Sequence, residues 1–234
     1  MSTVLLIRHG RTTANTAGIL AGQAPGVGLD DVGVTQARNM AERLAGVRLS
    51  ALVCGPLQRC RETADLLIAD GRAPEVVIDH RLTECDYGAW TGRRLAELSR
   101  HRLWRVIRSH PAAVTFPGGE SMRAVQARAV DAVREHDALV SEAAGPRAIW
   151  AAVSHGDVIK AVVADALGMH LDLFQRLVVD LGSVTVLTYT ELRPFVVSLN
   201  DTGGNPSGLQ GKQRGTRGGS PHGGRRRRGM VIGS

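Results

Sequence analysis

Histidine and arginine side chains follow three short apolar segments of this 234-residue chain. Their positions are Arg8 and His9 after the first segment, Arg59 after the second and His155 after the third. A guanidinium is a planar fork that binds phosphate oxygens in pairs and keeps its charge near neutral pH. A neutral imidazole is a nucleophile, and nearby guanidiniums help to keep it neutral. The combination predicts binding and transfer of a phosphate group.

A carboxylic acid would complete such a site, and two candidates lie between the second and third segments. Glu84 and Asp86 stand two residues apart. A carboxylic acid can protonate a departing alkoxide and then, as a carboxylate, take a proton from water. We favour Glu84, although spacing alone leaves Asp86 open. The backbone N–H groups that begin with Gly156 open a predicted helix, and they can also bind an anion.

The residues around these positions alternate between strand-like and helix-like patterns. Short apolar runs predict strands at residues 3–8, 49–54 and 147–154. Helical spacing and start signals predict helices at residues 33–45, 56–69, 94–109, 121–142 and 157–167. Pro56 is expected in the first turn of its helix and Ser121 as an N-cap. Residues 184–190 and 195–199 predict a hairpin.

This alternation predicts an α/β sandwich whose mostly parallel sheet has an antiparallel hairpin at its edge. In open α/β sheets, ligands bind in the crevice at the carboxyl ends of the strands. The histidines and arginines named above follow those ends. We therefore expect two imidazoles, at least two guanidiniums and a carboxylate in one crevice, with the neighbouring Arg61 on the outer surface of its helix.

The composition excludes several other classes of protein. Three cysteines leave one unpaired, so the chain is not a small disulfide scaffold. No apolar run approaches the roughly 18 residues that span a bilayer, and Arg8 interrupts the first apolar run too early for a secretory signal. We expect a cytoplasmic protein with reduced thiols and no membrane partner.

The net charge of +7 belongs to the C-terminal residues. Residues 1–202 contain 22 Lys and Arg and 22 Asp and Glu, whereas residues 203–234 contain seven basic residues and no acidic one. This Gly-rich tail cannot bury enough apolar surface to offset the entropy of ordering, so we expect it to be disordered. Its run Arg225–Arg228 could bind nucleic acid, which is not expected as a partner of residues 1–202.

The common cofactor motifs are missing from the sequence. It contains no GxGxxG, GxxxxGK[ST], HExxH or GxSxG, and no Cys/His cluster with zinc spacing. We therefore expect neither a nucleotide cofactor nor a metal. The arginines and the second histidine must then neutralise the charge of the transition state.

Five segments in this order resemble the histidine phosphatase superfamily, the phosphoglycerate-mutase-like proteins. The segments are LIRHGRTTAN ending at Asn15, GPLQRCRETA at 55–64, LTECDYGAWTG at 82–92, PGGES at 117–121 and SHGDVIKAV at 154–162. The resemblance covers about residues 3–200. It implies a three-layer α/β/α sandwich with a lid at about residues 86–120, within one domain of residues 1–202.

The resemblance also implies a role for each matching residue. His9 would be the nucleophile that becomes phosphohistidine, Arg8 and Arg59 the phosphate clamps, His155 a hydrogen-bond donor to the phosphoryl group, and Glu84 the general acid and base. Further substrate contacts are implied for Asn15, Gly22, Gln23 and the backbone amide of Gly156. The expected partner is a phosphorylated small molecule, no metal is needed, and a homodimer is possible.

The shared mechanism allows two outcomes after phosphoryl transfer. Attack by water makes a phosphatase, whereas return of the group to a bound product makes a mutase. Mutases of this family typically carry E-R-x-Y-G at the acid, but here Cys85 and Asp86 follow Glu84, which replaces a positive charge with a negative one nearby. We favour a phosphatase, with a phosphomutase as the alternative. A remoter alternative is a non-catalytic binder that acts through the basic tail.

Overall fold

The computed structural model describes residues 2–69 and 75–204. Within these residues, six strands form one sheet in the order β3-β2-β4-β1-β5-β6. The strands are β1 Thr3–Arg8, β2 Ala51–Cys54, β3 Val76–Ile78, β4 Ile149–Ser154, β5 Val184–Tyr189 and β6 Pro194–Asp201. Pairs β3–β2, β2–β4 and β4–β1 are parallel, whereas β5 runs antiparallel to β1 and β6 to β5. This confirms the predicted mostly parallel sheet with an antiparallel hairpin.

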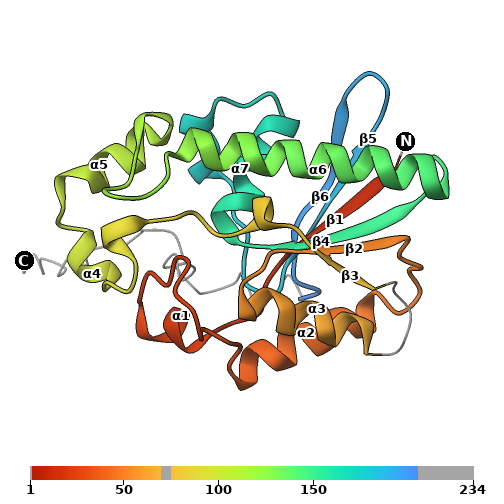
Figure 1. The fold of residues 1–234 in the computed structure, drawn as a ribbon, viewed down its shortest axis with the longest axis horizontal. Coiled ribbons are helices and arrows are strands. Elements are labelled where there is room, and N and C mark those ends of the chain that lie inside the picture. The colour runs from red at the N-terminus through yellow and green to blue at the C-terminus, as the bar shows by residue number, and fades with distance from the viewer. Residues whose placement is uncertain (1, 70–74, 205–234) are drawn as a thin grey trace, which may run out of the picture.

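Helices cover both faces of the sheet, which gives three layers (Figure 1). The main helices are α2 Asp31–Arg43, α3 Gln58–Ile68, α6 Met122–Ala144 and α7 Gly156–Ala166. Alternate residues of β1 belong to different apolar clusters: Val4 and Leu6 pack with residues of α6 and α7, and Leu5 and Ile7 pack with residues of α2 and α3. A strand that is buried on both faces reads as the continuous apolar run seen in the sequence.

Polar side chains fix where two of these helices begin. Ser121 is the N-cap of α6, and its Oγ accepts a hydrogen bond of 3.1 Å from Ala124 N–H, as predicted. Asp30 caps α2 in the same way through Gly33 N–H at 2.8 Å. The cap explains why α2 begins at Asp31, before its predicted start at residue 33.

The prediction of one helix at residues 94–109 is wrong. The structure has two short helices there, α4 Leu95–Leu98 and α5 Arg102–Ser109. The break lies at His101, whose backbone is extended and whose side chain accepts a hydrogen bond from Leu103 N–H. Histidine is an unusual N-cap, so the apolar spacing alone did not show this boundary.

Helix α3 also begins later than predicted. Leu57 has an extended backbone, with ψ of 143°, and is the N-cap, so the first helical residue is Gln58. Pro56 therefore precedes the helix rather than lying in its first turn. Three further short features were not predicted: helix α1 Thr13–Ala17, strand β3 and the extension of β6 beyond 195–199 to Pro194 and Asp201.

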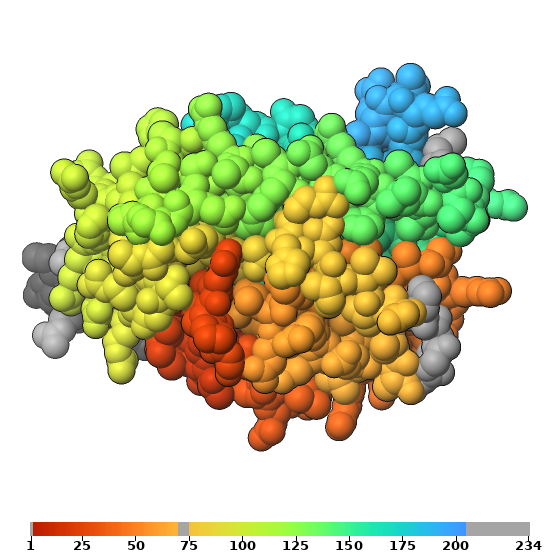
Figure 2. All heavy atoms as spheres, viewed as in Figure 1, coloured from red at the N-terminus to blue at the C-terminus, as the bar shows by residue number. Residues whose placement is uncertain are grey.

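Residues 86–120, which we call the lid segment, lie at one end of the molecule and contact the loop after α1. Leu20 N–H donates to the Arg93 carbonyl at 2.9 Å, and Leu95 N–H donates to the Gly18 carbonyl at 2.8 Å. Figure 2 shows these two parts of the chain side by side. Backbone hydrogen bonds thus hold this segment beside the loop after α1, and its action as a lid stays a prediction.

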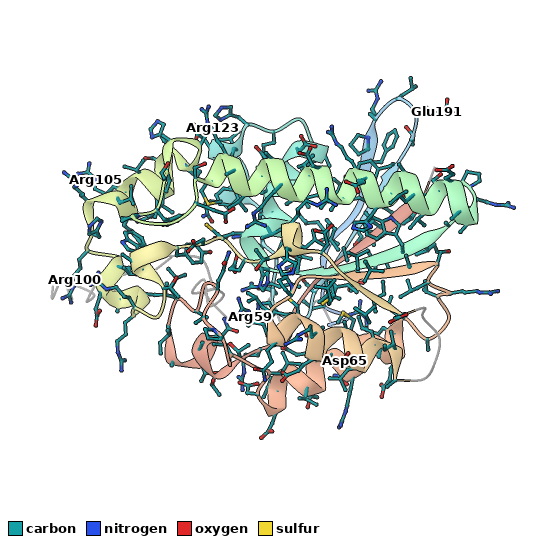
Figure 3. All side chains as sticks on the ribbon, in the orientation of Figure 1. Arg59, Asp65, Arg100, Arg105, Arg123 and Glu191 are labelled. Carbon is teal, nitrogen blue, oxygen red and sulfur yellow. The ribbon has the colours of Figure 1, made fainter. Side chains whose placement is uncertain are left out.

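The charges of residues 1–202 cancel in sum but are separated in space. Residues 91–123 contain seven arginines and only two acidic residues, and all seven arginines are exposed. Arg100, Arg105 and Arg123 project from this end of the molecule in Figure 3. The equal totals of acidic and basic residues therefore did not predict the positive surface that these seven arginines form. We call it the positive lid surface.

The predicted disordered tail lies outside the described residues from residue 205 onward, as does the run Arg225–Arg228. Across residues 2–69 and 75–204, no helix combines the length and the apolar character that crossing a membrane requires. Cys54, Cys60 and Cys85 are buried free thiols.

Candidate active site

The carboxyl ends of the four parallel strands meet at one edge of the sheet and bring the predicted residues there. Arg8 ends β1 and His9 follows it, while His155 follows β4 as the N-cap of α7. Arg59 lies in the first turn of α3, after β2, and occupies the centre of the molecule in Figure 3. Glu84 comes after β3 by way of a short 3₁₀ turn. Four strand ends therefore contribute to one site.

One pocket collects six of the predicted residues, and we call it the phosphate pocket. They are Arg8, His9, Asn15, Gly22, Arg59 and Glu84. Apolar side chains that include Leu20, Tyr87 and Leu95 complete its wall. Its free volume is about 370 Å³ when the part open to solvent is counted. The polar groups thus converge on one space at the carboxyl edge of the sheet.

The protonation state of His9 follows from its hydrogen bonds. Its Nδ1 lies 2.7 Å from the Gly10 carbonyl, and because a carbonyl only accepts, Nδ1 carries the proton. Its Nε2 then keeps a lone pair, which accepts a hydrogen bond of 3.3 Å from Arg59 Nε. Burial, Arg59 and Arg8 lower the pKa of His9 well below its usual value. The imidazole is therefore neutral at pH 7, with its lone pair in the phosphate pocket.

His155 packs against His9 rather than lining the phosphate pocket. The two ring centroids are 5.1 Å apart in an edge-on arrangement, and His155 is fully buried. Its Nδ1 is 3.9 Å from Glu84 Oε2, and Cys60 Sγ is 3.3 Å from its Nε2. Burial and then Arg59 lower the pKa of His155 well below its usual value. A second neutral imidazole thus lies near both His9 and the carboxyl group of Glu84.

The two arginines keep unpaired donors for an anion. Arg8 Nη1 donates to the Val179 carbonyl at 2.6 Å, and Arg59 Nη2 donates to the Gly22 carbonyl at 2.7 Å. Within the described residues, Arg8 Nε and Arg59 Nη1 are buried and have no hydrogen-bond partner. Leaving charged donors buried and unpaired is costly, so bound phosphate oxygens would stabilise this arrangement.

Two glycines allow close approaches around the site, one to Arg8 and one to the backbone of Gly33. A Cβ on Gly156 would lie 3.0 Å from Arg8 Cζ, so a side chain there would displace the guanidinium. A Cβ on Gly10 would lie 2.5 Å from the carbonyl oxygen of Gly33, at the start of α2. The glycine that follows each histidine is therefore required by close contact. Gly156 does not line the pocket itself, and its substrate contact stays a prediction.

The structure favours Glu84 over Asp86 as the carboxyl group of the site. The Glu84 side chain is 14% exposed and lines the phosphate pocket, where burial and the neighbouring Asp157 raise its pKa to about 7. The hydrogen bond from Cys85 N–H and the charge of Arg59 act in the opposite direction. Asp86 instead accepts a hydrogen bond of 2.9 Å from Gly88 N–H and stabilises the turn. Glu84 can therefore act as an acid near neutral pH.

The remaining predicted residues have mixed positions. Asn15 lines the phosphate pocket, and its Oδ1 accepts hydrogen bonds from the backbone and hydroxyl of Thr12. Gln23 does not line the pocket, because its amide donates to the Glu84 carbonyl at 2.8 Å. It therefore holds the turn that carries Glu84, and its own contact with substrate stays a prediction. Arg61 is exposed on α3, as expected.

Two residues with roles at this site were missed by the sequence reasoning. Asp157 is buried on α7, accepts a hydrogen bond of 2.9 Å from the Tyr87 hydroxyl and contributes to the raised pKa of Glu84. Arg128 on α6 donates to the carbonyls of Thr83 and Glu84 at 2.9 and 3.2 Å. Asp157 directly follows the His-Gly pair, which could have identified it. Arg128 could not be identified from the sequence, because it lies in the middle of a helix and far from Glu84 along the chain.

In the part of the chain that the structure describes, this edge of the sheet does not gather metal-ligating side chains. Within residues 2–69 and 75–204, no three His, Cys, Asp or Glu side chains form a group that could hold a metal ion. The positive charge in the phosphate pocket comes from Arg8 and Arg59. The negative charge of a bound phosphate would thus lie near two guanidiniums that hydrogen bonds to main-chain carbonyls hold in place.

Comparison with known proteins matches residues 4–202 to the histidine phosphatase superfamily (branch 1). A bifunctional protein of Mycobacterium tuberculosis is 33% identical over 86% of this chain and 54% of its own length. A probable phosphoglycerate mutase of Cronobacter sakazakii is 30% identical over 89% of this chain and 95% of its own. The chain spans about half the length of the first curated relatives it matches.

Solved structures agree with this match. Mycobacterial glucosyl-3-phosphoglycerate phosphatase, solved as a complex with VO3, superposes with a TM-score of 0.76 at 28% identity. The superposition covers 85% of this chain and 98% of the other. The family match extends over nearly all the described residues, and it includes every side chain of the pocket described above. The chain belongs to the histidine phosphatase superfamily.

Proposed function

We propose that this chain hydrolyses phosphate monoesters of small molecules through a phosphohistidine formed on His9, without a metal. The observation that supports this most strongly is the unprotonated Nε2 of a buried, neutral His9 beside two buried guanidiniums. A nucleophile and fixed positive charges in one pocket suit attack on phosphorus. Membership of the superfamily and the phosphatase among its solved relatives also support the proposal.

In the first step, His9 Nε2 attacks phosphorus in line with the departing ester oxygen. A P–N bond forms, the P–O bond to the alcohol breaks, and protonated Glu84 gives its proton to the departing oxygen. Arg8 and Arg59 bind the other phosphate oxygens, and His155 donates a hydrogen bond to them. The products are a free alcohol, a phosphohistidine and an ionised Glu84.

In the second step, a water molecule attacks the phosphohistidine. Glu84, now a carboxylate, takes a proton from this water as its oxygen bonds to phosphorus, and the P–N bond breaks. Phosphate leaves, His9 is neutral again, and Glu84 is protonated for the next cycle. A group with a pKa of about 7 is suited to both roles, because neither protonation state is strongly disfavoured.

The residues after Glu84 support hydrolysis over phosphoryl return. A mutase must hold its second phosphorylated product, which requires positive charge near the acid. Here Cys85 is buried and its N–H bonds Glu84, while the Asp86 carboxylate is committed to its turn. Neither side chain offers a positive charge to a second anionic group.

A phosphate-release panel tests this proposal directly. Glycerol phosphate, sugar phosphates, nucleoside monophosphates, phosphorylated hydroxy acids and phosphopeptides are compared with isomerisation of phosphoglycerate in the presence of bisphosphoglycerate. We expect phosphate release from at least one small monoester, lost in His9→Ala. Isomerisation that outpaces phosphate release would instead identify a mutase.

Removal of residues 203–234 tests the alternative that acts through the tail. The pocket residues named above all lie within residues 1–202, so the truncated chain should keep its turnover. A binder that relies on the tail would lose its salt-dependent affinity for nucleic acid and have no turnover to keep.

A further inference from the structure

Resting on the proposed function, we infer that Arg128 and Glu120 are positioning residues, which hold the turn that carries Glu84 so that its carboxyl group reaches the departing oxygen of the substrate. The turn comprises residues 81–86, and we call it the acid turn. Neither positioning residue lines the phosphate pocket. The inference adds one residue of α6 and one at the end of the lid segment to those on which the proposed reaction depends.

Arg128 holds the acid turn from α6 through main-chain carbonyls. Its Nη1 donates to the carbonyls of Arg81 and Thr83 at 2.6 and 2.9 Å, and its Nη2 donates to the Glu84 carbonyl at 3.2 Å. The chain before the lid segment runs beside α6 in Figure 1. A guanidinium presents several donors in one plane, so one side chain can bind three carbonyls at once. Arg128 therefore fixes the backbone up to and including Glu84.

Glu120 extends this arrangement to the end of the acid turn. Its Oε1 accepts a hydrogen bond of 2.7 Å from Arg128 Nε, and its Oε2 accepts one of 2.9 Å from Arg128 Nη2. The same Oε2 accepts a hydrogen bond of 3.0 Å from Asp86 N–H. Burial opposes the charge of Glu120, but the hydrogen bonds from Arg128 and Asp86 N–H lower its pKa below the usual value. An ionised Glu120 thus joins Arg128 to the last residue of the acid turn.

The backbone around Glu120 also packs directly against the acid turn. Glu120 N–H donates to the Asp86 carbonyl at 2.8 Å. A Cβ on Gly119 would clash with the oxygen of that carbonyl, so only glycine allows the approach. The PGGES segment at 117–121 has no role in the two chemical steps proposed above. Its contacts indicate that it supports the acid turn instead.

The position of the Glu84 carboxyl group depends on this backbone. Within the part of the chain that the structure describes, the carboxyl group accepts one hydrogen bond, from Cys85 N–H at 3.0 Å. It therefore moves with its turn, and a displacement of about 1 Å can lower a reaction rate about 100-fold. His9, Arg8 and Arg59 are held by other main-chain carbonyls. Loosening the acid turn should thus impair protonation of the leaving group more than attack on phosphorus.

Two esters with different leaving groups test the inference. We expect Arg128→Met to lower kcat/KM about 10- to 100-fold for glycerol 3-phosphate, whose alkoxide needs the proton of Glu84. The hydrogen bond from Gln23 to the Glu84 carbonyl remains in this variant, so the loss should not be complete. The loss for 4-nitrophenyl phosphate should be less than about threefold, because its leaving group departs as a stable anion.

Arg134→Met is the matched control for this variant. Arg134 lies on the same helix and forms an exposed ion pair of 2.7 Å with Asp165, so its replacement should leave both kcat/KM values unchanged. The ratio of the two esters is measured on one preparation of each variant, and a fraction of unfolded protein does not alter it. Equal losses on the two esters in Arg128→Met, or no loss on either, would overturn the inference.

A double-mutant cycle tests whether the two positioning residues act together. Glu120→Gln keeps the shape of the side chain but removes its charge, so it should lower kcat/KM for glycerol 3-phosphate about three- to tenfold. Because both residues hold the same turn, the double variant with Arg128→Met should lose little more than Arg128→Met alone. Losses that multiply in the double variant would contradict their joint action.

Hydrogen exchange tests the hold on the acid turn without any activity. Asp86 N–H is bonded to Glu120, so its exchange should be at least about tenfold faster in Arg128→Met and in Glu120→Gln than in the wild type or Arg134→Met. Unchanged exchange would overturn this inference alone. Phosphate release from neither ester by the wild-type protein would contradict the proposed function, and exchange at Asp86 would then still decide whether the two residues hold the turn.

Discussion

The phosphate pocket and the neighbouring aromatic cluster of Tyr87, Trp90, Trp104, Phe116 and Phe174 present different chemistry. The phosphate pocket contains two buried guanidiniums, a neutral imidazole and a carboxyl group with a raised pKa. The rings of the aromatic cluster are buried in the hydrophobic core, and the Tyr87 hydroxyl already donates to Asp157. The difference indicates that the first region carries groups that could react with phosphorus, whereas the second packs the core beside it. Changes in the first should affect every substrate.

The largest difference between substrates is expected from Glu84→Gln, which keeps the shape of the side chain but removes its acidic proton. We expect kcat/KM to fall by about 10²–10⁴ for glycerol 3-phosphate, because its leaving alkoxide needs a proton in the transition state. The loss should be much smaller for 4-nitrophenyl phosphate, whose leaving group is stable as an anion. Equal losses on the two esters would count against Glu84 as the acid.

The next largest effect is expected from Arg59→Met, which removes a phosphate clamp. Loss of preorganised charge should lower kcat/KM by about 10²–10³ on alkyl and nitrophenyl esters alike. Arg61→Met is the matched control, because Arg61 lies two residues away on the exposed side of α3. Similar activities of the two variants would contradict the assignment of Arg59.

The pH dependence should follow the carboxyl group. Burial and Asp157 both disfavour the charged form of Glu84, so they raise its pKa to about 7 and keep it protonated below that pH. We expect kcat/KM for glycerol 3-phosphate to fall about tenfold per pH unit above 7. The lowered pKa of His9 means that no loss should occur near its usual value of 6.5 on the acidic side.

Asp157→Asn sharpens this measurement. Removing the neighbouring negative charge should lower the pKa of Glu84, so the fall of kcat/KM at alkaline pH should begin at a lower pH. If this fall begins at the same pH in the variant, a group other than Glu84 titrates. Thermal unfolding of the variant separates this shift from a loss of stability.

The smallest effect is expected from the positive lid surface, whose arginines do not line the phosphate pocket. Replacing Arg102, Arg105 and Arg108 of α5 with Gln should lower kcat/KM about two- to fivefold at low salt, because anionic substrates approach a less positive surface. The effect should vanish at high salt, with kcat unchanged. Arg48, Arg147 and Arg193 lie at the amino edge of the parallel strands, so their triple replacement is the control with equal charge. Equal effects of the two triple variants would contradict a local role for the lid.

The phosphate pocket was largely predictable from the sequence because its residues are fixed by the backbone. Arg8, His9 and His155 stand directly at strand ends, and parallel strands end at one edge of a sheet. The choice between Glu84 and Asp86 was not predictable from spacing. This choice depends on the turn in which Asp86 accepts a hydrogen bond from Gly88 N–H, and the spacing of apolar residues does not predict such a turn.

The aromatic cluster was not predictable in the same way. Its side chains come from the lid segment and the turn at Phe174, so only the folded chain brings them together. The break between α4 and α5 was also hidden, because apolar residues keep helical spacing within each helix, Leu95 and Leu98 before the His101 cap and Trp104 and Ile107 after it. Burial by distant segments, rather than local pattern, determines this part of the core.

The central claim is that His9 accepts the phosphoryl group, and trapping the phosphorylated protein tests it most directly. The protein is mixed with ³²P-labelled glycerol 3-phosphate, quenched in alkali within milliseconds and digested for mapping by mass spectrometry. We predict an acid-labile, alkali-stable label on His9 that forms before phosphate is released and is absent from His9→Ala. Phosphate release with no labelled intermediate, or with the label on another residue, would contradict the account.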